Sequence, residues 1–388
     1  MNSGRTVFAQ LMDFLPLHEF RKCVRSHRGE HKVRSFTCLD QFLAMAFAQL
    51  TFRESLRDIE TCLRAMGHKL YHSGFRGRVS RSTLADANEH RDSRLFEDFA
   101  HVLIDLARPL YCGESFGVEL DHAAYAIDST TIDLCLALFP WARFRKHKAA
   151  VKLHTLLDLR GSIPCVIRVT DGKTHDLNFL DWFVVEPGAF YIMDRGYIDF
   201  ERLYRIHQAG AFFVIRSKGN LVSKTLSYRA VDKSSGLRSD HVIQLTGPLT
   251  AQLYPVLLRR VHFSDAETQN RIVVLTNHLE LDALTVSGLY KARWSIELFF
   301  KWIKQHLRIK AFFGTSPNAV KTQVWIAISV YVLVAIVKKR LRLDCPLSEI
   351  LQILSISLFE KVDIYHALTT QGTKNAESDN HNQLLLFK

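Results

Sequence analysis

The chain has 388 residues, of which 47% are hydrophobic and 23% charged, so it is expected to be globular, with roughly two or three structural units. A formal net charge of +12 favours a polyanionic partner such as nucleic acid or anionic lipid. The seven cysteines include no CxxC pair, which argues against a zinc ribbon and against a secreted disulfide framework.

The N-terminal third of the chain is predicted to be helical. Apolar residues recur at a spacing of three to four residues in four segments, 7–15, 38–49, 56–66 and 94–107. A further short helix is expected to end at Glu89, with Ser82 or Thr83 as its N-cap. Basic residues cluster in segments 21–34 and 76–81, a pattern that suits a DNA-binding domain and equally suits simple solvation.

Two short apolar segments, each predicted to be a strand, end in an aspartate. Residues 124–127 lead into Asp128, and residues 190–193 lead into Asp194. Between them, residues 150–169 with their Gly-Ser turn predict a β-hairpin. Either aspartate alone is weak support for a catalytic site, because aspartate commonly follows a strand as a turn or N-cap residue.

The next part of the chain alternates helical and strand patterns. Residues 199–209 are expected to be helical and 212–216 to form a strand. Residues 217–277 are polar and rich in turn signals, which predicts an insertion of β-strands that ends with the strand 271–276.

The C-terminal part is predicted to contain a buried helix over residues 321–341, two short helices and a loose tail from residue 372. The longest uncharged apolar run, residues 324–337, is too short to span a bilayer, and the N-terminus lacks the apolar core of a signal peptide. No membrane association is therefore expected.

Residues 289–308 are predicted to form one amphipathic helix. At about 100° per residue, Tyr290, Arg293, Glu297 and Lys304 share one face. The same stripe includes Lys301 and Arg308. For an arbitrary helix this pattern would mean a solvated face with i,i+4 charge pairs.

The aromatic residues of this helix favour a second interpretation, in which a strand of nucleic acid lies along the basic face. Tyr290 and Trp294 are costly to expose to water and are suited to stacking on bases. The basic face also contains the carboxylate of Glu297. The two upstream aspartates could supply carboxylates that act together with it.

Asp128, Asp194 and Glu297 together predict a metal site at one edge of a sheet. Carboxylate oxygens are the ligands that Mg²⁺ requires, and two such ions roughly 4 Å apart can promote in-line displacement at phosphorus. The chain contains no GxSxG, GxxxxGK[ST] or GxGxxG motif, so neither an esterase site nor ATP use is indicated.

These residues resemble the DDE transposases of the insertion-sequence 4 family. The resemblance rests on Asp128 in IDST, Asp194 in MDRGY and the spacing Tyr290-x2-Arg293-x3-Glu297-x6-Lys304. It implies a ribonuclease-H-like α/β fold, a mixed sheet flanked by helices in which the first and fourth strands lie side by side. It also implies a helical N-terminal DNA-binding domain (1–118), a catalytic domain (119–315) and C-terminal helices that pack on the core (316–388).

The resemblance further implies that Asp128, Asp194 and Glu297 bind two Mg²⁺ ions, for which Mn²⁺ can substitute. The DNA contacts are assigned to Tyr290, Arg293, Trp294, Lys301, Lys304 and Arg308. The expected partners are double-stranded DNA, as element ends and as target, and a second copy of the chain in a synaptic complex. The expected location is the bacterial cytoplasm, at the nucleoid when the protein is bound to DNA.

Two alternatives remain open from the sequence. One is a metal-dependent nuclease of the same fold that cleaves DNA without strand transfer. The other is a non-catalytic repressor derived from a transposase.

Overall fold

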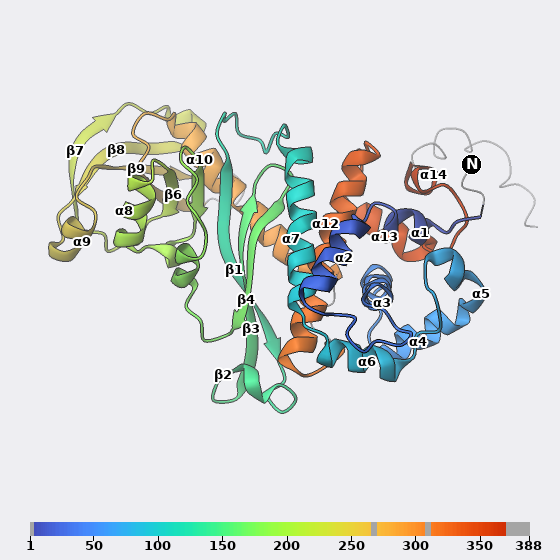
Figure 1. Cartoon of the computed structure of the whole chain (residues 1–388). Helices are drawn as coiled ribbons and strands as arrows, with labels where there is room; N and C mark the ends of the chain where they lie inside the picture. Colours follow the sequence, from blue (N-terminus) through green and yellow to red (C-terminus); the bar gives the residue numbers. More distant parts are fainter. Residues whose placement is uncertain (1–3, 265–269, 307–311, 370–388) are drawn as a thin grey trace, which may run out of the picture. The chain divides into compact units, whose positions relative to one another are not determined.

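The computed structural model describes residues 4–264, 270–306 and 312–369, and the chain divides into two units (Figure 1). The helical unit comprises residues 1–110 and 302–388, and the sheet unit comprises residues 111–301. The boundary falls within helix α11 (Trp294–His306).

The helical unit contains the helices predicted near the N-terminus and two that were not predicted. Its described helices are α1 (Val7–Met12), α2 (Leu17–Ser26), α3 (Cys38–Leu50), α4 (Leu56–Ala65), α5 (Gly67–Leu70), α6 (Arg81–His90), α7 (Arg94–Tyr111), α12 (Pro317–Arg340), α13 (Leu347–Ser357) and α14 (Ile364–Thr369). The unpredicted helices are α2, which occupies part of the basic segment, and the four-residue α5. The N-cap prediction for α6 was wrong, because the side chain of Ser80 accepts the backbone N–H of Thr83.

Helix α12 forms the centre of the helical unit and packs against α3 and α6. In the described part of the chain it is the one helix whose length and apolar composition would allow it to cross a membrane. Of its most apolar stretch, 94% is buried, which is the environment of a core helix. Helix α12 therefore contributes to the core of the helical unit.

The sheet unit contains one ten-stranded mixed sheet. Its described strands are β1 (Ala124–Leu134), β2 (Arg143–Arg145), β3 (Lys148–Asp158), β4 (Ile163–Asp171), β5 (Phe190–Met193), β6 (Phe212–Arg216), β7 (Ser223–Arg229), β8 (Leu237–Leu245), β9 (Leu258–Ser264) and β10 (Arg271–Thr276). Strands β4, β3, β1, β5 and β6 lie side by side in that order, and the short β2 pairs with the end of β3. Strand β1 runs parallel to β5, and β5 runs parallel to β6. If β2 is left aside, β1 and β5 are the first and fourth strands, adjacent as expected.

The predicted β-insertion continues this sheet beyond β6. Strand β10 pairs antiparallel with β6, and β9, β8 and β7 follow in order, with the short helix α9 (Pro248–Leu253) between β8 and β9. A buried pair, Arg259 and Asp240, joins β9 to β8 at 2.7 Å. The parallel pairs β1–β5 and β5–β6 and the antiparallel strands of the insertion thus belong to one continuous sheet.

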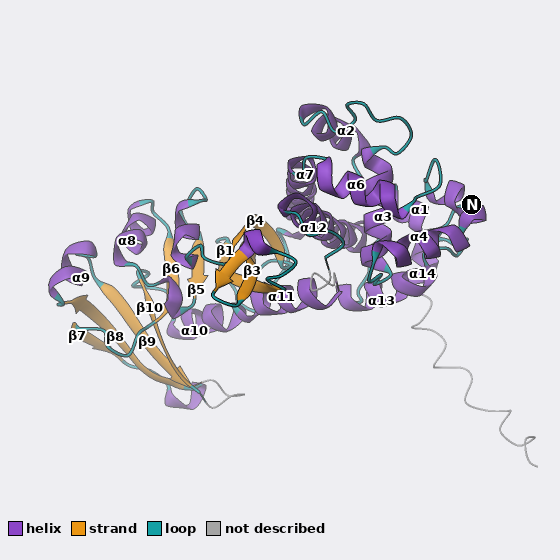
Figure 2. Ribbon diagram, turned by 90° about the horizontal axis from the view of Figure 1, so that it is seen from below, coloured by secondary structure: helices purple, strands orange, loops and turns teal. Residues whose placement is uncertain are grey.

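Helices lie on both faces of the sheet (Figure 2). Helix α8 (Phe200–Gln208) packs on β6 from one side, whereas α10 (Ala283–Ala292) packs against β5, β6, β8 and β9 on the other. Neighbouring residues on a strand point to opposite faces, so the side chains of β1 contribute alternately to the two faces of the sheet. Tyr125 and Ile127 join the apolar core that includes Phe179 and Leu203, on the α8 side.

Candidate active site

The two aspartates lie at the end of the parallel pairing between β1 and β5. The last paired residues are Ile127 and Met193, and the next residue on each strand is Asp128 or Asp194. Strand β1 itself continues past Asp128, so the prediction that this strand ends there was wrong. The strand continues because β3 remains paired with it, with Thr155 opposite Asp128.

Arg293 joins Asp128 to the glutamate of the predicted site. Its Nη1 donates to Asp128 Oδ2 at 3.2 Å, and its Nη2 donates to Glu297 Oε1 at 2.6 Å. The side chain of Arg293 is only 14% exposed. Burial acts to lower the pKa of Arg293, but Tyr290 and the two carboxylates hold it above its ordinary value, so the guanidinium stays charged.

Asp128 is buried close to two other carboxylates, and its pKa is raised. Burial raises the pKa of Asp128 to about 6, and repulsion from Glu297 and Asp194 adds to this effect. The backbone N–H of Ser129 and the guanidinium of Arg293 act in the opposite direction. Three carboxylates with one nearby arginine therefore form an arrangement that additional cations would stabilise.

The helix predicted over residues 289–308 is divided in the structure. Helix α10 ends at Ala292, Arg293 lies in a turn, and α11 starts at Trp294. The backbone N–H groups of Arg293 and Ile296 each bond to the carbonyl three residues earlier, which tightens the chain at this point. Arg293 and Glu297 remain close enough across this junction to bond at 2.6 Å.

The candidate DNA-contacting residues differ in exposure. Trp294 is 56% exposed, whereas Tyr290 is buried, with its hydroxyl 3.5 Å from Asp194 Oδ1. Lys301 is exposed and Lys304 half-buried. The sixth candidate, Arg308, lies outside the described residues.

A polar cluster beside Asp128 was not predicted from the sequence. It consists of Ser129, Lys152, His154 and Asp176, the last from the 3₁₀ helix η3 (Asp176–Asp181). Burial acts to raise the pKa of Asp176, but hydrogen bonds from Ser129 and Lys152 hold it below its usual value. No spacing in the loop that carries Asp176 indicates a role for it.

The three carboxylates are linked two at a time in the described residues. In residues 4–264, 270–306 and 312–369, no three His, Cys, Asp or Glu side chains are grouped so that they could hold one ion. Asp128 and Asp194 follow neighbouring residues of paired strands, and Arg293 bridges Asp128 and Glu297. Two carboxylates suffice for Mg²⁺, because waters and substrate phosphate oxygens complete its coordination.

The fold and the site define a class of protein. The strand order β4-β3-β1-β5-β6, with acidic residues on adjacent strands β1 and β5 and on a following helix, is the arrangement of ribonuclease-H-like enzymes. Such enzymes act at the phosphodiester bonds of nucleic acids, which agrees with the basic composition of the chain.

Comparison with known proteins narrows the class to one family. Residues 119–333 match the family described as "Transposase DDE domain", and residues 3–76 match a "Domain of unknown function (DUF4372)". "Putative transposase y4zB" of Sinorhizobium fredii is 34% identical over 72% of this chain and 78% of its own length. "Probable transposase for insertion sequence element IS5377" of Geobacillus stearothermophilus is 35% identical over 53% of this chain and 54% of its own length.

A third relative covers nearly the whole chain. "Putative transposase for insertion sequence element IS4SA" of a Synechocystis strain is 23% identical over 91% of this chain and 98% of its own length. The chain belongs to the DDE transposases of the insertion-sequence 4 family. It is a DNA transposase, of a family whose general reaction is strand transfer with the use of divalent metal.

Proposed function

We propose that this transposase catalyses cut-and-paste transposition: it cleaves DNA at the ends of its own element and joins the freed 3′-ends to a target duplex. The observation that carries the proposal is the placement of Asp128 and Asp194 directly after the last residue pair of the β1–β5 ladder. Glu297 supplies the third carboxylate of the set, and Arg293 links it to Asp128.

In this proposal Asp128, Asp194 and Glu297 hold two Mg²⁺ ions, or Mn²⁺ in their place. Bound there, such ions activate a water or a 3′-hydroxyl and stabilise the departing oxygen. The chain's own contribution is to place the carboxylates on rigid elements and to balance their charge. With the charge of bound ions on Asp128 and Glu297, the guanidinium of Arg293 would be free to pair with a DNA phosphate.

The DNA contacts come from the residues around the junction of α10 and α11. Trp294 is exposed beside Arg293 and can stack on a base. Lys301, about two helical turns further along α11, is also exposed and can bind phosphates. We retain Tyr290 and Lys304 as phosphate contacts because they belong to the family motif, and Arg308 because the sequence periodicity places it on the same stripe. The buried position of Tyr290 requires its hydroxyl, rather than its ring, to make that contact.

Two further parts of the proposal follow from the reaction. Strand transfer requires both element ends to be held together, so a homodimer assembled on the two ends is proposed. The protein acts in the bacterial cytoplasm, at the nucleoid when bound to DNA, without ATP and without a membrane.

The test is a cleavage and joining assay on a duplex that carries the terminal repeat of the element, with Mg²⁺ and a target duplex. The parent protein is compared with Glu297→Gln, and Glu280→Gln serves as the matched control because Glu280 is exposed in the same part of the chain. We expect joined product from the parent and the control, and at least a hundredfold less from Glu297→Gln, with end binding retained.

Other outcomes would overturn the proposal. Cleavage without joining would indicate a nuclease of the same fold. End binding without cleavage by the parent would indicate a repressor. Equal joining by Glu297→Gln would remove Glu297 from the catalytic set.

A further inference from the structure

Asp128 is connected to a second carboxylate through its neighbour on β1. The backbone N–H of Ser129 donates to Asp128 Oδ1 at 2.8 Å, and the Ser129 hydroxyl donates to Asp176 Oδ1 at 2.7 Å. Lys152 Nζ lies 3.1 Å from the same oxygen of Asp176. Ser129 therefore bonds the carboxylate of Asp128 through its backbone N–H. Its side-chain hydroxyl is bonded in turn to Asp176.

The two carboxylates belong to opposite faces of the sheet. Successive side chains on a strand alternate, so the side chain of Ser129 projects away from that of Asp128. Ser129 is paired with His154 on β3, and Lys152 lies two residues from His154 on the same face. Asp176 thus reaches Asp128 through Ser129 and not directly.

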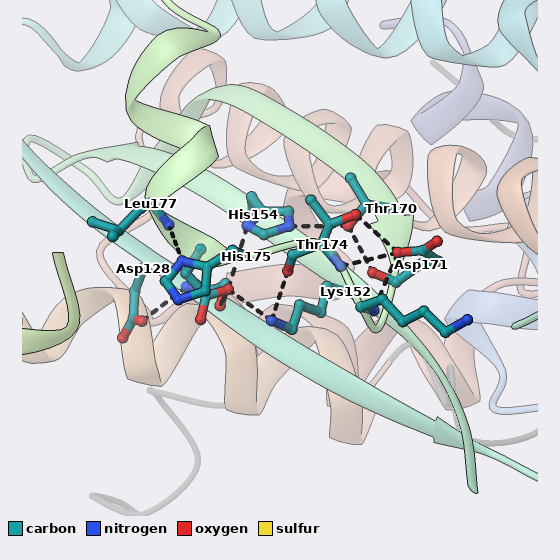
Figure 3. A network of polar contacts seen from close by, with 11 residues as sticks. Asp128, Lys152, His154, Thr170, Asp171, Thr174, His175 and Leu177 are labelled. Atoms are coloured by element: carbon teal, nitrogen blue, oxygen red, sulfur yellow. Dashed lines mark hydrogen bonds and ion pairs between the residues drawn. The ribbon is translucent and has the colours of Figure 1, made fainter. Parts of the chain in front are cut away.

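The segment that presents Asp176 is fixed by its own hydrogen bonds (Figure 3). Asp171 Oδ1 accepts the backbone N–H and the hydroxyl of Thr174, which closes the turn after β4. Lys152 Nζ donates to the carbonyl of Thr174 at 2.9 Å, and His175 Nδ1 accepts the N–H two residues ahead as the cap of η3. Lys152 therefore ties both the loop and the carboxylate of Asp176 to strand β3.

We propose that Asp176 is a positioning residue of the active site, which fixes Ser129 and through it the orientation of the Asp128 carboxylate. Lys152 neutralises the charge of Asp176 and holds it in place. The inference rests on the proposed function, in which Asp128 binds a divalent ion. Partners that orient a ligand in this way typically contribute 10–100-fold to metal affinity or activity.

The first test measures Mn²⁺ binding to the full-length protein without DNA by isothermal titration calorimetry. Asp176→Asn is expected to weaken Mn²⁺ binding by roughly 10–100-fold, and to lower kcat for end cleavage with little change in KM. The matched control is Asp181→Asn, in the same 3₁₀ helix, because Asp181 pairs with Arg202 instead of Ser129. The control is expected to bind Mn²⁺ as the parent does.

A double-mutant cycle separates positioning from direct metal binding. Ser129→Ala removes only the hydroxyl and keeps the N–H that holds Asp128, so it should fold normally and weaken Mn²⁺ binding in the same direction. The double variant Ser129→Ala/Asp176→Asn should be no weaker than Asp176→Asn alone, because both changes break one contact. If the two losses of Mn²⁺ affinity are additive, or if only Asp176→Asn weakens binding, the proposal is overturned, and Asp176 would instead bind the metal directly.

One further variant separates failure of this inference from failure of the proposed function. If Asp128→Asn leaves Mn²⁺ binding unchanged, the proposed metal site itself is wrong. If Asp128→Asn abolishes binding while Ser129→Ala and Asp176→Asn only lower the melting temperature, Asp176 has a merely structural role and the inference is overturned.

Discussion

Arg293 supplies positive charge to two carboxylates of the metal-free site. It bonds Asp128 and Glu297 while 14% of its side chain is exposed, and its buried Nε has no hydrogen-bond partner among the residues that the structure describes. In the proposed metal site, a guanidinium held in this way would compete with the ion for the same oxygens. The residue that the family motif assigns to DNA therefore also balances the charge of these two carboxylates.

We predict that Arg293→Gln lowers the stability of the metal-free protein by about 1–3 kcal/mol, because two partly buried carboxylates lose their counter-charge. Mn²⁺ should restore more of the melting temperature in the variant than it adds to the parent, since no arginine competes with the ion. Thermal unfolding with and without Mn²⁺ measures both effects. Lys301→Gln, which removes an exposed charge from α11, is the control, and an equal Mn²⁺ effect in all three proteins would contradict the prediction.

His154 is the buried titratable residue beside Asp176. Its Nε2 lies 3.0 Å from the hydroxyl of Thr170, and its Nδ1 lies 3.7 Å from Asp176 Oδ1. Burial lowers the pKa of His154 to about 4, more than the carboxylate of Asp176 raises it, and the ammonium of Lys152 adds to the lowering. The imidazole is therefore neutral in the folded protein at neutral pH.

This pKa shift predicts a pH dependence of folding stability. The unfolded chain takes up a proton on His154 near pH 6.5 and the folded chain near pH 4, so the stabilisation is complete above pH 6.5 and is lost as pH falls towards 4. His154→Gln should remove at most about 3 kcal/mol of the fall in unfolding free energy between pH 7 and pH 4.5. Urea unfolding at both pH values measures the difference, with the exposed His147→Gln as control; identical curves for parent and His154→Gln would refute it.

At the scale of elements, the β3–β4 hairpin depends on one glycine. Gly161 has φ +73°, and a Cβ atom there would lie 2.0 Å from Cδ1 of the Tyr111 ring. The turn therefore requires glycine both for its backbone conformation and for the space beside it. The sequence pattern predicted this turn correctly from the Gly-Ser pair, but it contained no sign of the tyrosine.

We predict that Gly161→Ala destabilises the protein by more than about 1 kcal/mol, because alanine does not tolerate this φ and the ring must also move. Gly219→Ala is the control, since nothing lies within 4 Å of its added Cβ. Adding Tyr111→Ala to Gly161→Ala should relieve the clash while leaving the backbone strain. Denaturant midpoints would show this as a loss smaller than the sum of the two single changes, and strict additivity would disprove the proposed clash.

At the scale of the whole molecule, the helical unit is built from both ends of the chain. Helix α12 packs against α3 and α6, and Asn318 at its start donates to the carbonyls of Asn88 and Arg91. The predicted N-terminal domain of residues 1–118 thus includes only part of this unit. Its apolar core is completed by residues that follow the catalytic domain in sequence.

We predict that a fragment of residues 1–118 does not fold cooperatively, because the surface of α3 and α6 that α12 covers would face water. Co-expression with a second fragment, residues 312–388, should restore a cooperative thermal transition. Circular dichroism and dye binding to exposed apolar surface measure the outcome. A fragment 1–118 that melts cooperatively on its own would show that the N-terminal domain is independent.

Local sequence patterns were sufficient for most elements of the sheet unit. Strands β6 and β10 have the bounds that their apolar, β-branched composition predicts, and the hairpin and the helix α8 lie where they were expected. Helix α2 was missed because its basic residues dominate the composition of the segment. The break at Arg293 was missed because the periodicity of the surrounding residues continues through it.

The sequence by itself determined the family, the ribonuclease-H-like class of fold and the residue types available to the site, because these depend on motifs and on local periodicity. Only the tertiary structure decided which residues meet across strands. The pairing of β1 with β5 brings Asp128 next to Asp194, and the pairing of β1 with β3 gives Ser129 its neighbours Lys152 and Asp176. Such contacts depend on the register of strands distant in sequence, which no local pattern encodes.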